Sequence, residues 1–216
     1  HEMGHFVGLD HSPYSHATMF PAGFVGQSFA ATLDVDDLAG LRSLYPTAPA
    51  TFPLGYGSVT GNVTLWNGLP AQGVHVALTD AILGVSGPSA LTTPAGTFTI
   101  AGVPTGVYRL AAEPLNGPMN SGHVSAGWGT TTFSVNVKSA VLGGATPTLH
   151  PVRAGVATAA GTLALPAGNP LLNPMGVTPA TTGTQAGTVV IGRAAVLAAG
   201  YSQFLQIWGA TFNTVP

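Results

Sequence analysis

The sequence predicts a multidomain chain in which a segment with two short helices is followed by mainly-β, sandwich-like modules. Three observations lead to this prediction. Histidines at the start of the chain recur at helical spacing, and the stretch 47–56 contains prolines, which is typical of an extended linker. After residue 57, apolar residues alternate with polar ones, as they do in half-buried strands.

The composition excludes several classes of protein. The 216 residues include 30 Gly and 18 Pro, but a hydrophobic content of 45% and a net charge of −2 exclude a chain that is disordered throughout. Five Lys and Arg in total are too few for an electrostatic nucleic-acid surface. No apolar run reaches the roughly 18 residues of a transmembrane helix. The absence of Cys excludes a disulfide framework.

Residues 1–11 follow the pattern H-E-x-x-H-x-x-G-x-x-H. On a helix, His1 and His5 project from the same face and can share a metal ion. Gly8 is expected to end this helix, because glycine tolerates the left-handed conformation of a sharp turn. His11 can then return to the same metal. Three neutral imidazoles around Zn²⁺ leave a fourth position for water, as in a catalytic site.

Glu2 is offset from His1 by about 100° around the helix axis. This offset suits a carboxylate that acts beside the metal better than it suits a third ligand. We therefore expect Glu2 to be the general base that accepts a proton from a zinc-activated water.

The residues that follow match a known pattern. Ser12 comes directly after the third histidine, and residues 17–21 form an Ala-x-Met-aromatic-Pro Met-turn. This arrangement resembles the matrixin branch of the metzincin metallopeptidases. The resemblance implies that Met19 forms an apolar floor under the three imidazoles, and that Pro21 takes part in substrate binding.

Residues 33–46 predict a helix. Asp34 is a good N-cap with Asp37 as its capping-box partner, and Pro46 stops the helix. Acidic residues at positions 36 and 37 suit a helix N-terminus electrostatically. In matrixins such a pair also ties the helix to the Met-turn, and both roles remain open at this point.

The resemblance covers residues 1–46, which we expect to be the C-terminal part of a catalytic domain, a partial α+β metzincin subdomain. It implies a zinc-dependent endopeptidase with a protein or peptide substrate, secreted into an extracellular or extracellular-matrix setting. Matrixins also bind calcium, for which no ligands can be identified in this chain. Their sheet lies upstream of this point, so we expect a fragment that requires the upstream part for activity.

Residues 57–142 predict a β-sandwich. They resemble a carboxypeptidase-regulatory-like domain of the transthyretin type through glycines, prolines and a tyrosine at characteristic spacing. Such domains are generally noncatalytic. The residues that carry the resemblance are Gly61, Val63, Gly68, Pro70, Gly73, Val76, Thr93, Gly96, Phe98, Ile100, Gly102, Pro104, Gly106 and Tyr108. Strands are predicted near residues 59–65, 74–78, 98–100, 107–110 and 133–137.

Residues 143–216 are predicted to be a further β region. Strands are expected at 188–192 and 204–212, and the stretch 206–212 resembles immunoglobulin-like repeats of bacterial surface proteins. A truncated immunoglobulin-like domain is therefore one interpretation of this region.

The remaining histidines are not expected to bind the metal. His16, in the loop before the Met-turn, is close enough to compete for it, but a solvated loop residue is the favoured interpretation. His75, His123 and His150 lack partners at ligand spacing and are expected to face solvent.

An alternative function comes from a different class. The chain could belong to an extracellular adhesion or structural protein whose β modules bind and whose protease remnant is inactive. The intact Glu2 and the three histidines favour the enzyme, because loss of any one of them would abolish activity.

Overall fold

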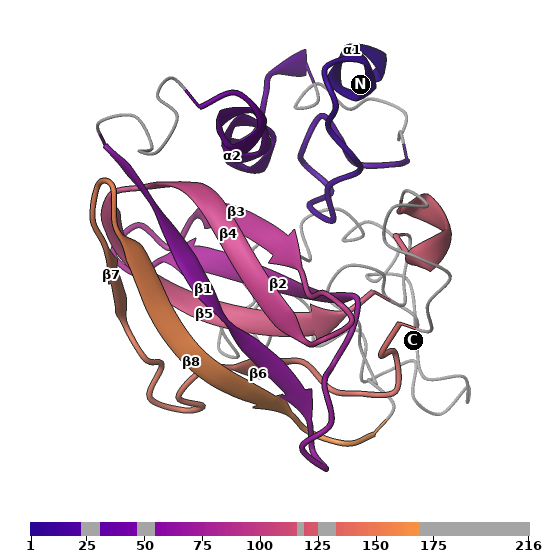
Figure 1. Ribbon diagram of the computed structural model, residues 1–216, viewed down its shortest axis with the longest axis vertical. Helices are drawn as coiled ribbons and strands as arrows, with labels where there is room; N and C mark the ends of the chain where they lie inside the picture. Colours follow the sequence, from indigo (N-terminus) through magenta and orange to yellow (C-terminus); the bar gives the residue numbers. More distant parts are fainter. Residues whose placement is uncertain (23–30, 47–54, 116–118, 125–132, 169–216) are drawn as a thin grey trace, which may run out of the picture.

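Figure 1 shows the computed structural model of the chain, which is mostly β. The structure describes residues 1–22, 31–46, 55–115, 119–124 and 133–168. Within these ranges it contains the helices α1 (Glu2–Phe6) and α2 (Val35–Leu44), the 3₁₀ turn η2 (Ser121–His123), and the strands β1 (Tyr56–Leu65), β2 (Val74–Asp80), β3 (Ser86–Leu91), β4 (Thr97–Pro104), β5 (Gly106–Pro114), β6 (Ala140–Val141), β7 (His150–Val152) and β8 (Ala157–Leu165).

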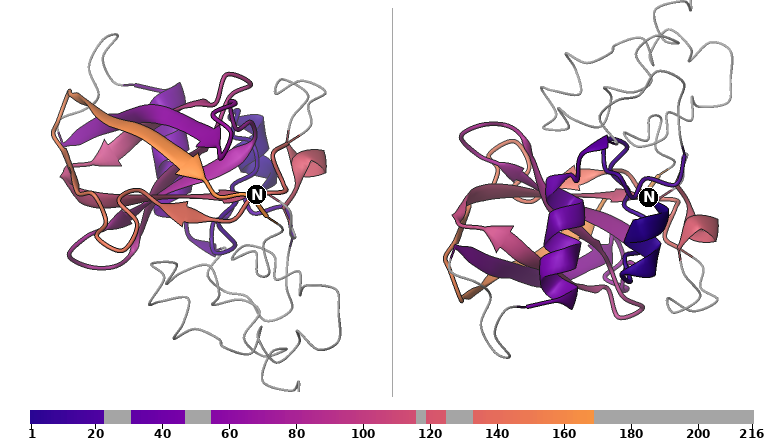
Figure 2. Two further views of the ribbon diagram at one scale, coloured as in Figure 1. Left: turned by 90° about the horizontal axis from the view of Figure 1, so that it is seen from below. Right: turned by 90° about the horizontal axis from the view of Figure 1, so that it is seen from above.

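The strands form two sheets that pack against each other (Figure 1, Figure 2). One sheet has the order β4–β1–β8, and the other has the order β3–β2–β5–β6, with β7 also paired to β5. The pairing of β1 with β8 is parallel, and the other pairings are antiparallel. The core between the sheets includes Val59, Val63, Val76, Leu78, Ile100, Leu110 and Leu165.

The alternating patterns produce the strands that they predict. In β1, Val59 and Val63 are fully buried. Gly61 lies between them, and a Cβ there would lie 2.7 Å from the carbonyl oxygen of Gly161 and 2.8 Å from Cζ of Phe98. The predicted strands at 59–65, 74–78, 98–100 and 107–110 are thus confirmed, and glycine is required where β1 is covered on both sides.

The sheets continue past the boundary expected at residue 143. Strand β7 pairs with β5 in one sheet, and β8 pairs with β1 in the other. Leu163 and Leu165 of β8 are buried in the core. The Thr- and Ala-rich sequence of β8 does not reveal this role, because only Leu163 and Leu165, at its end, are buried.

The strand predicted at residues 133–137 is not formed. Phe133 and Val137 are buried, but Val137 makes only an isolated bridge to Ala167. The ring of Phe133 packs onto Gly73, where a Cβ would collide with it. Within the described residues, the first strand after Phe133 is therefore β6.

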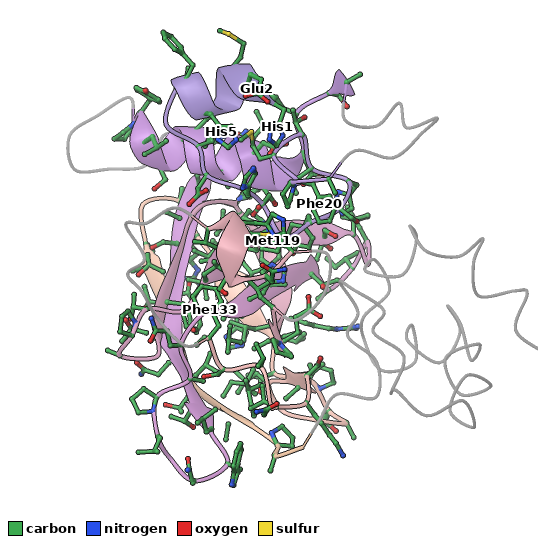
Figure 3. All side chains as sticks on the ribbon, turned by 90° about the vertical axis from the view of Figure 1, so that its right-hand side faces the viewer. His1, Glu2, His5, Phe20, Met119 and Phe133 are labelled. Atoms are coloured by element: carbon green, nitrogen blue, oxygen red, sulfur yellow. The ribbon has the colours of Figure 1, made fainter. Side chains whose placement is uncertain are left out.

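The N-terminal segment packs directly on the sandwich. Helix α2 lies over β3 and β4 (Figure 1). Below α1, Phe20 shares a second hydrophobic cluster with Met119 and Phe133 (Figure 3). Tyr14, in the loop before the Met-turn, belongs to the same cluster. Residues 1–46 and the β-sandwich therefore share a buried contact.

Some expectations fall outside the described residues. These are most of the linker at 47–56, and the region 169–216 with its two predicted strands and the immunoglobulin-like stretch. Within the described ranges, none of the helices has the length and apolarity that crossing a bilayer requires.

Two leucines test whether β8 is an integral strand of the sandwich. Leu165→Ala removes a fully buried side chain and should lower the free energy of unfolding by about 2–5 kcal/mol. The matched control is Leu149→Ala, whose side chain is 53% exposed, and it should change stability by less than about 0.5 kcal/mol. Urea unfolding of both variants measures the difference, and equal stabilities would contradict the observed pairing.

Candidate metal centre

Three histidine rings converge beside α1. His1 and His5 lie at the two ends of this turn of helix, and His11 lies in the following coil. Their ring centroids are 4.8–5.3 Å apart, and one nitrogen from each ring lies within 4.8 Å of the others. The structure thus brings together the three predicted metal-ligating residues.

A backbone carbonyl holds each of these rings. Nδ1 of His1 is 2.8 Å from the carbonyl oxygen of Thr18, and Nδ1 of His5 is 2.9 Å from that of Leu9. Nδ1 of His11 is hydrogen-bonded to the carbonyl oxygen of His123. Because a carbonyl oxygen can only accept, Nδ1 must carry the proton in all three rings.

This tautomer leaves a lone pair on Nε2 of each ring. A neutral imidazole with its other nitrogen bonded to a carbonyl is the usual form of a histidine metal ligand. The donor set therefore fits a divalent ion that prefers nitrogen ligands. His1 and His5 are exposed and His11 is partly buried, so the cluster is accessible from solvent.

Two glycines shape the helix that carries the first two histidines. Gly8 has φ +95° and follows Val7, the C-cap of α1, as the sequence predicts for the residue that redirects the chain. Gly4 lies between His1 and His5, and a Cβ at this position would collide with Sδ of Met19. No sequence motif marks Gly4, although the absence of a side chain there is what allows α1 to pack on Met19.

Met19 is buried, with 1% of its surface exposed. Its backbone N–H donates to Asp37 at 3.1 Å, and the N–H of Thr18 donates to the same carboxylate at 2.9 Å. The carbonyl oxygen of the same residue, Thr18, is the one that accepts the hydrogen bond from His1. Asp37 also accepts the N–H of Asp34, so it closes the predicted capping box and fixes the turn at the same time.

The neighbouring carboxylate connects the site to the sandwich. Asp36 accepts the Ser12 hydroxyl at 2.6 Å, and it accepts both the N–H and the hydroxyl of Ser89 in β3, at 2.6 and 2.9 Å. Burial raises the pKa of the Asp36 carboxyl to about 6. Asp36 and Asp37 therefore both make tertiary contacts, and Asp37 has the local capping role as well.

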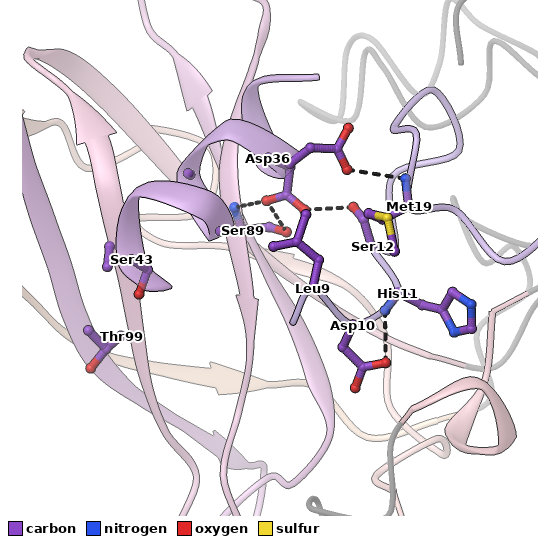
Figure 4. Close-up of a pocket in the computed structure, with 13 residues that line it drawn as sticks. Leu9, Asp10, His11, Ser12, Met19, Asp36, Ser43, Ser89 and Thr99 are labelled. Atoms are coloured by element: carbon purple, nitrogen blue, oxygen red, sulfur yellow. Dashed lines mark hydrogen bonds between the residues drawn. The ribbon is translucent and has the colours of Figure 1, made fainter. Parts of the chain in front are cut away.

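A pocket of about 210 Å³ lies between the chain after α1, helix α2 and the strands β3 and β4 (Figure 4). His11 and Met19 line one side of it, and Thr99 lines another. Asp36, Ser12 and Ser89 also line the pocket, and hydrogen bonds connect Asp36 to the two serines (Figure 4). The space beside the third histidine is thus bounded by both parts of the molecule.

The other predicted site residues lie nearby. Glu2 is exposed in the first turn of α1, next to His1 and His5 (Figure 3). Pro21 follows the buried Phe20 and is partly exposed. The roles expected for Glu2 and Pro21 remain predictions.

Several histidines differ from expectation. His123 is partly buried, and its ring lies edge-on to that of His11, with centroids 6.3 Å apart. His16 is partly buried and bonds to Asp34 at 2.9 Å. His150 is buried because β7 pairs with β5. No side-chain pattern marks these contacts, since they depend on pairing between distant segments.

His75 is also buried rather than solvent-facing. Its Nδ1 lies 3.0 Å from Oε1 of Glu113 on the adjacent strand, and the ring of Tyr14 packs edge-on at 5.1 Å between centroids. Burial lowers the pKa of His75 to about 3 and raises the pKa of Glu113 well above its ordinary value. The pair is therefore a structural contact under the loop that precedes the Met-turn.

Sequence comparisons connect the N-terminal segment with one family. The family model for matrixins matches residues 1–46. Metalloendoproteinase 4-MMP of Arabidopsis thaliana is 43% identical over 49 residues, which is 23% of this chain. The match spans 14% of the length of that relative.

Structural comparisons match about half of the chain. The Bacillus anthracis TIE protein has 12% identity and a TM-score of 0.33, over 52% of this chain and 17% of that protein. The 5-hydroxyisourate hydrolase of Klebsiella pneumoniae has 18% identity and a TM-score of 0.29, over 51% and 86%. A putative carbohydrate binding protein of Pseudomonas aeruginosa has 19% identity and a TM-score of 0.29, over 56% and 98%.

Asp36 should give the protein a pH-dependent stability. Its folded-state pKa of about 6 exceeds the ordinary value of 3.8, so the folded state binds more protons between these values. The contribution of Asp36 to the free energy of unfolding should therefore fall as the pH rises through this interval. Asp36→Asn keeps an oxygen for Ser89 and offers an N–H to Ser12, so it should remove this fall and be more stable at neutral pH by on the order of 1 kcal/mol.

Urea unfolding across this pH interval measures the difference between the variant and the wild type. The control is Asp80→Asn, which alters a carboxylate in an exposed turn and should leave the fall in place. Parallel stability curves for wild type and Asp36→Asn would refute the assignment.

Proposed function

We propose that residues 1–46 form the C-terminal part of the active site of a zinc-dependent endopeptidase of the matrixin type. The observation that carries the proposal is the set of three Nδ1-to-carbonyl hydrogen bonds, which leaves a lone pair on Nε2 of each ring, in a cluster where one nitrogen from each ring lies within 4.8 Å of the others. The matrixin match over the same residues supports it. The substrate class is a protein or peptide.

In this proposal, His1, His5 and His11 hold the ion through Nε2. A bound zinc ion would supply Lewis acidity to the scissile carbonyl and acidity to a water molecule. Glu2 accepts a proton from the attacking water while the water oxygen forms a bond to the carbonyl carbon of the substrate. When the C–N bond breaks, Glu2 passes that proton to the leaving amine nitrogen.

Met19 and Pro21 support the site in different ways. The buried thioether of Met19 lies against α1 and provides an apolar floor that competes weakly for zinc. We assign Pro21, at the end of the Met-turn, to the substrate-binding side. No group of calcium ligands was identified in the sequence.

The wider setting is part of the same proposal. We assign the protein to the extracellular space, where matrixins generally act, and we assign the β-sandwich to an accessory module. Helix α1 has five residues and buries none of them, so it depends on other packing partners. We therefore expect residues 1–216 alone to bind zinc weakly and to cleave nothing.

Zinc binding distinguishes the ligands from the other histidines. In the longest natural polypeptide that contains this chain, His5→Ala should abolish stoichiometric zinc retention after dialysis, because it removes one of three donors. His16→Ala is the matched control and should retain the metal, since His16 bonds to Asp34 instead. Elemental analysis measures the zinc content, and equal retention in both variants would reject the metal centre.

Activity tests the role of Glu2. In the same polypeptide, Glu2→Ala should keep the zinc and lower kcat for peptide hydrolysis by about 100-fold or more, because the proton acceptor is lost. Wild-type activity should disappear with a chelator and return with zinc. If the wild type holds zinc but cleaves no polypeptide, the adhesion or structural alternative replaces the enzyme.

A further inference from the structure

The support of His11 differs from that of the other two histidines. The carbonyls that hold His1 and His5 belong to Thr18 and Leu9, within the matrixin-like segment. The carbonyl that holds His11 belongs to His123, 112 residues away in the chain that follows β5. One of the three carbonyls that hold the rings therefore comes from outside the segment that contains the histidines.

The turn that presents this carbonyl is well fixed. Oδ1 of Asn120 accepts the N–H of Gly122 at 2.9 Å, and the N–H of Asn120 donates to Nδ1 of His123 at 3.3 Å. Met119 is fully buried in the cluster that also contains Tyr14 and Phe20 (Figure 3). Through Met119, the Asn120–His123 turn thus packs in the same apolar cluster as Tyr14 and Phe20 of the N-terminal segment.

We propose that the Asn120–His123 turn is a positioning element of the metal centre, which fixes the tautomer and orientation of His11 through the His123 carbonyl. This inference rests on the proposed function only in that the ring it positions is a metal ligand. The β-sandwich module is then more than a spacer, because it completes the supports of the site. None of its residues needs to touch the metal or the substrate.

The physical effect follows from the two tautomers of imidazole. With Nδ1–H held by a carbonyl, Nε2 keeps its lone pair and points away from the support. Without that bond, the neutral ring populates both tautomers and several orientations, and metal binding must select among them. Removing such an outer partner typically weakens metal affinity 10–100-fold.

Variants of the turn leave every ligand in place. Asn120→Ala removes the acceptor that closes the turn, and Gly122→Pro removes the donor of the same hydrogen bond. Asn120→Asp keeps the acceptor oxygen and should behave as the wild type. Asn67→Ala is the matched control, since Asn67 caps another exposed turn of the sandwich through a bond to the N–H of Leu69 at 3.2 Å.

The first measurement uses metal-free protein of residues 1–216. Long-range ¹H–¹⁵N spectra of the ring of His11, above the ordinary imidazole pKa of about 6.5, report which nitrogen carries the proton. The wild type, Asn67→Ala and Asn120→Asp should show the Nδ1–H form. Asn120→Ala and Gly122→Pro should shift His11, and not His1 or His5, toward a mixture of tautomers.

The second measurement is the zinc affinity of the longest natural polypeptide that contains this chain, determined by competition with a chromophoric chelator. Asn120→Ala and Gly122→Pro should bind zinc about tenfold more weakly than the wild type and Asn67→Ala. Unchanged tautomer and affinity in both turn variants would overturn the inference. Failure of the wild type to bind zinc would contradict the proposed function instead, while the metal-free spectra would still decide the role of the turn.

Discussion

Two adjacent carboxylates at the start of α2 hold the candidate site in place. Asp37 binds the backbone of the Met-turn, whose Thr18 carbonyl in turn holds His1. Asp36 binds Ser12, next to His11, and also Ser89 in the sandwich. Because side chains one residue apart on a helix point in different directions, one short stretch of sequence can fix the histidine cluster from two sides.

The matrixin-like segment could be predicted from sequence because its signals are local. The histidine spacing, the positive φ of Gly8 and the capped helix α2 depend on neighbouring residues, and the structure agrees with them. The strands with clear alternation of Val and Ile were predictable for the same reason. In each case the pattern of side chains carries the information.

The rest depends on contacts between distant segments. Strand β3 has the sequence Ser-Gly-Pro-Ser-Ala-Leu, which has no apolar alternation, and it is tolerated because it lies at a sheet edge. The support of His11 is a backbone carbonyl, and every residue type has one. Gly4 is required only because Met19 lies against it. Such features have no signature in the residues themselves.

The parallel pairing of β1 with β8 has a consequence for biosynthesis. About 90 residues separate the two strands, so at a translation rate of 5–20 residues per second one edge of β1 stays open for roughly 5–20 s. His1, His5 and His11 leave the ribosome long before the His123 carbonyl that holds His11. The three rings can therefore be held together only after residue 123 has been synthesised.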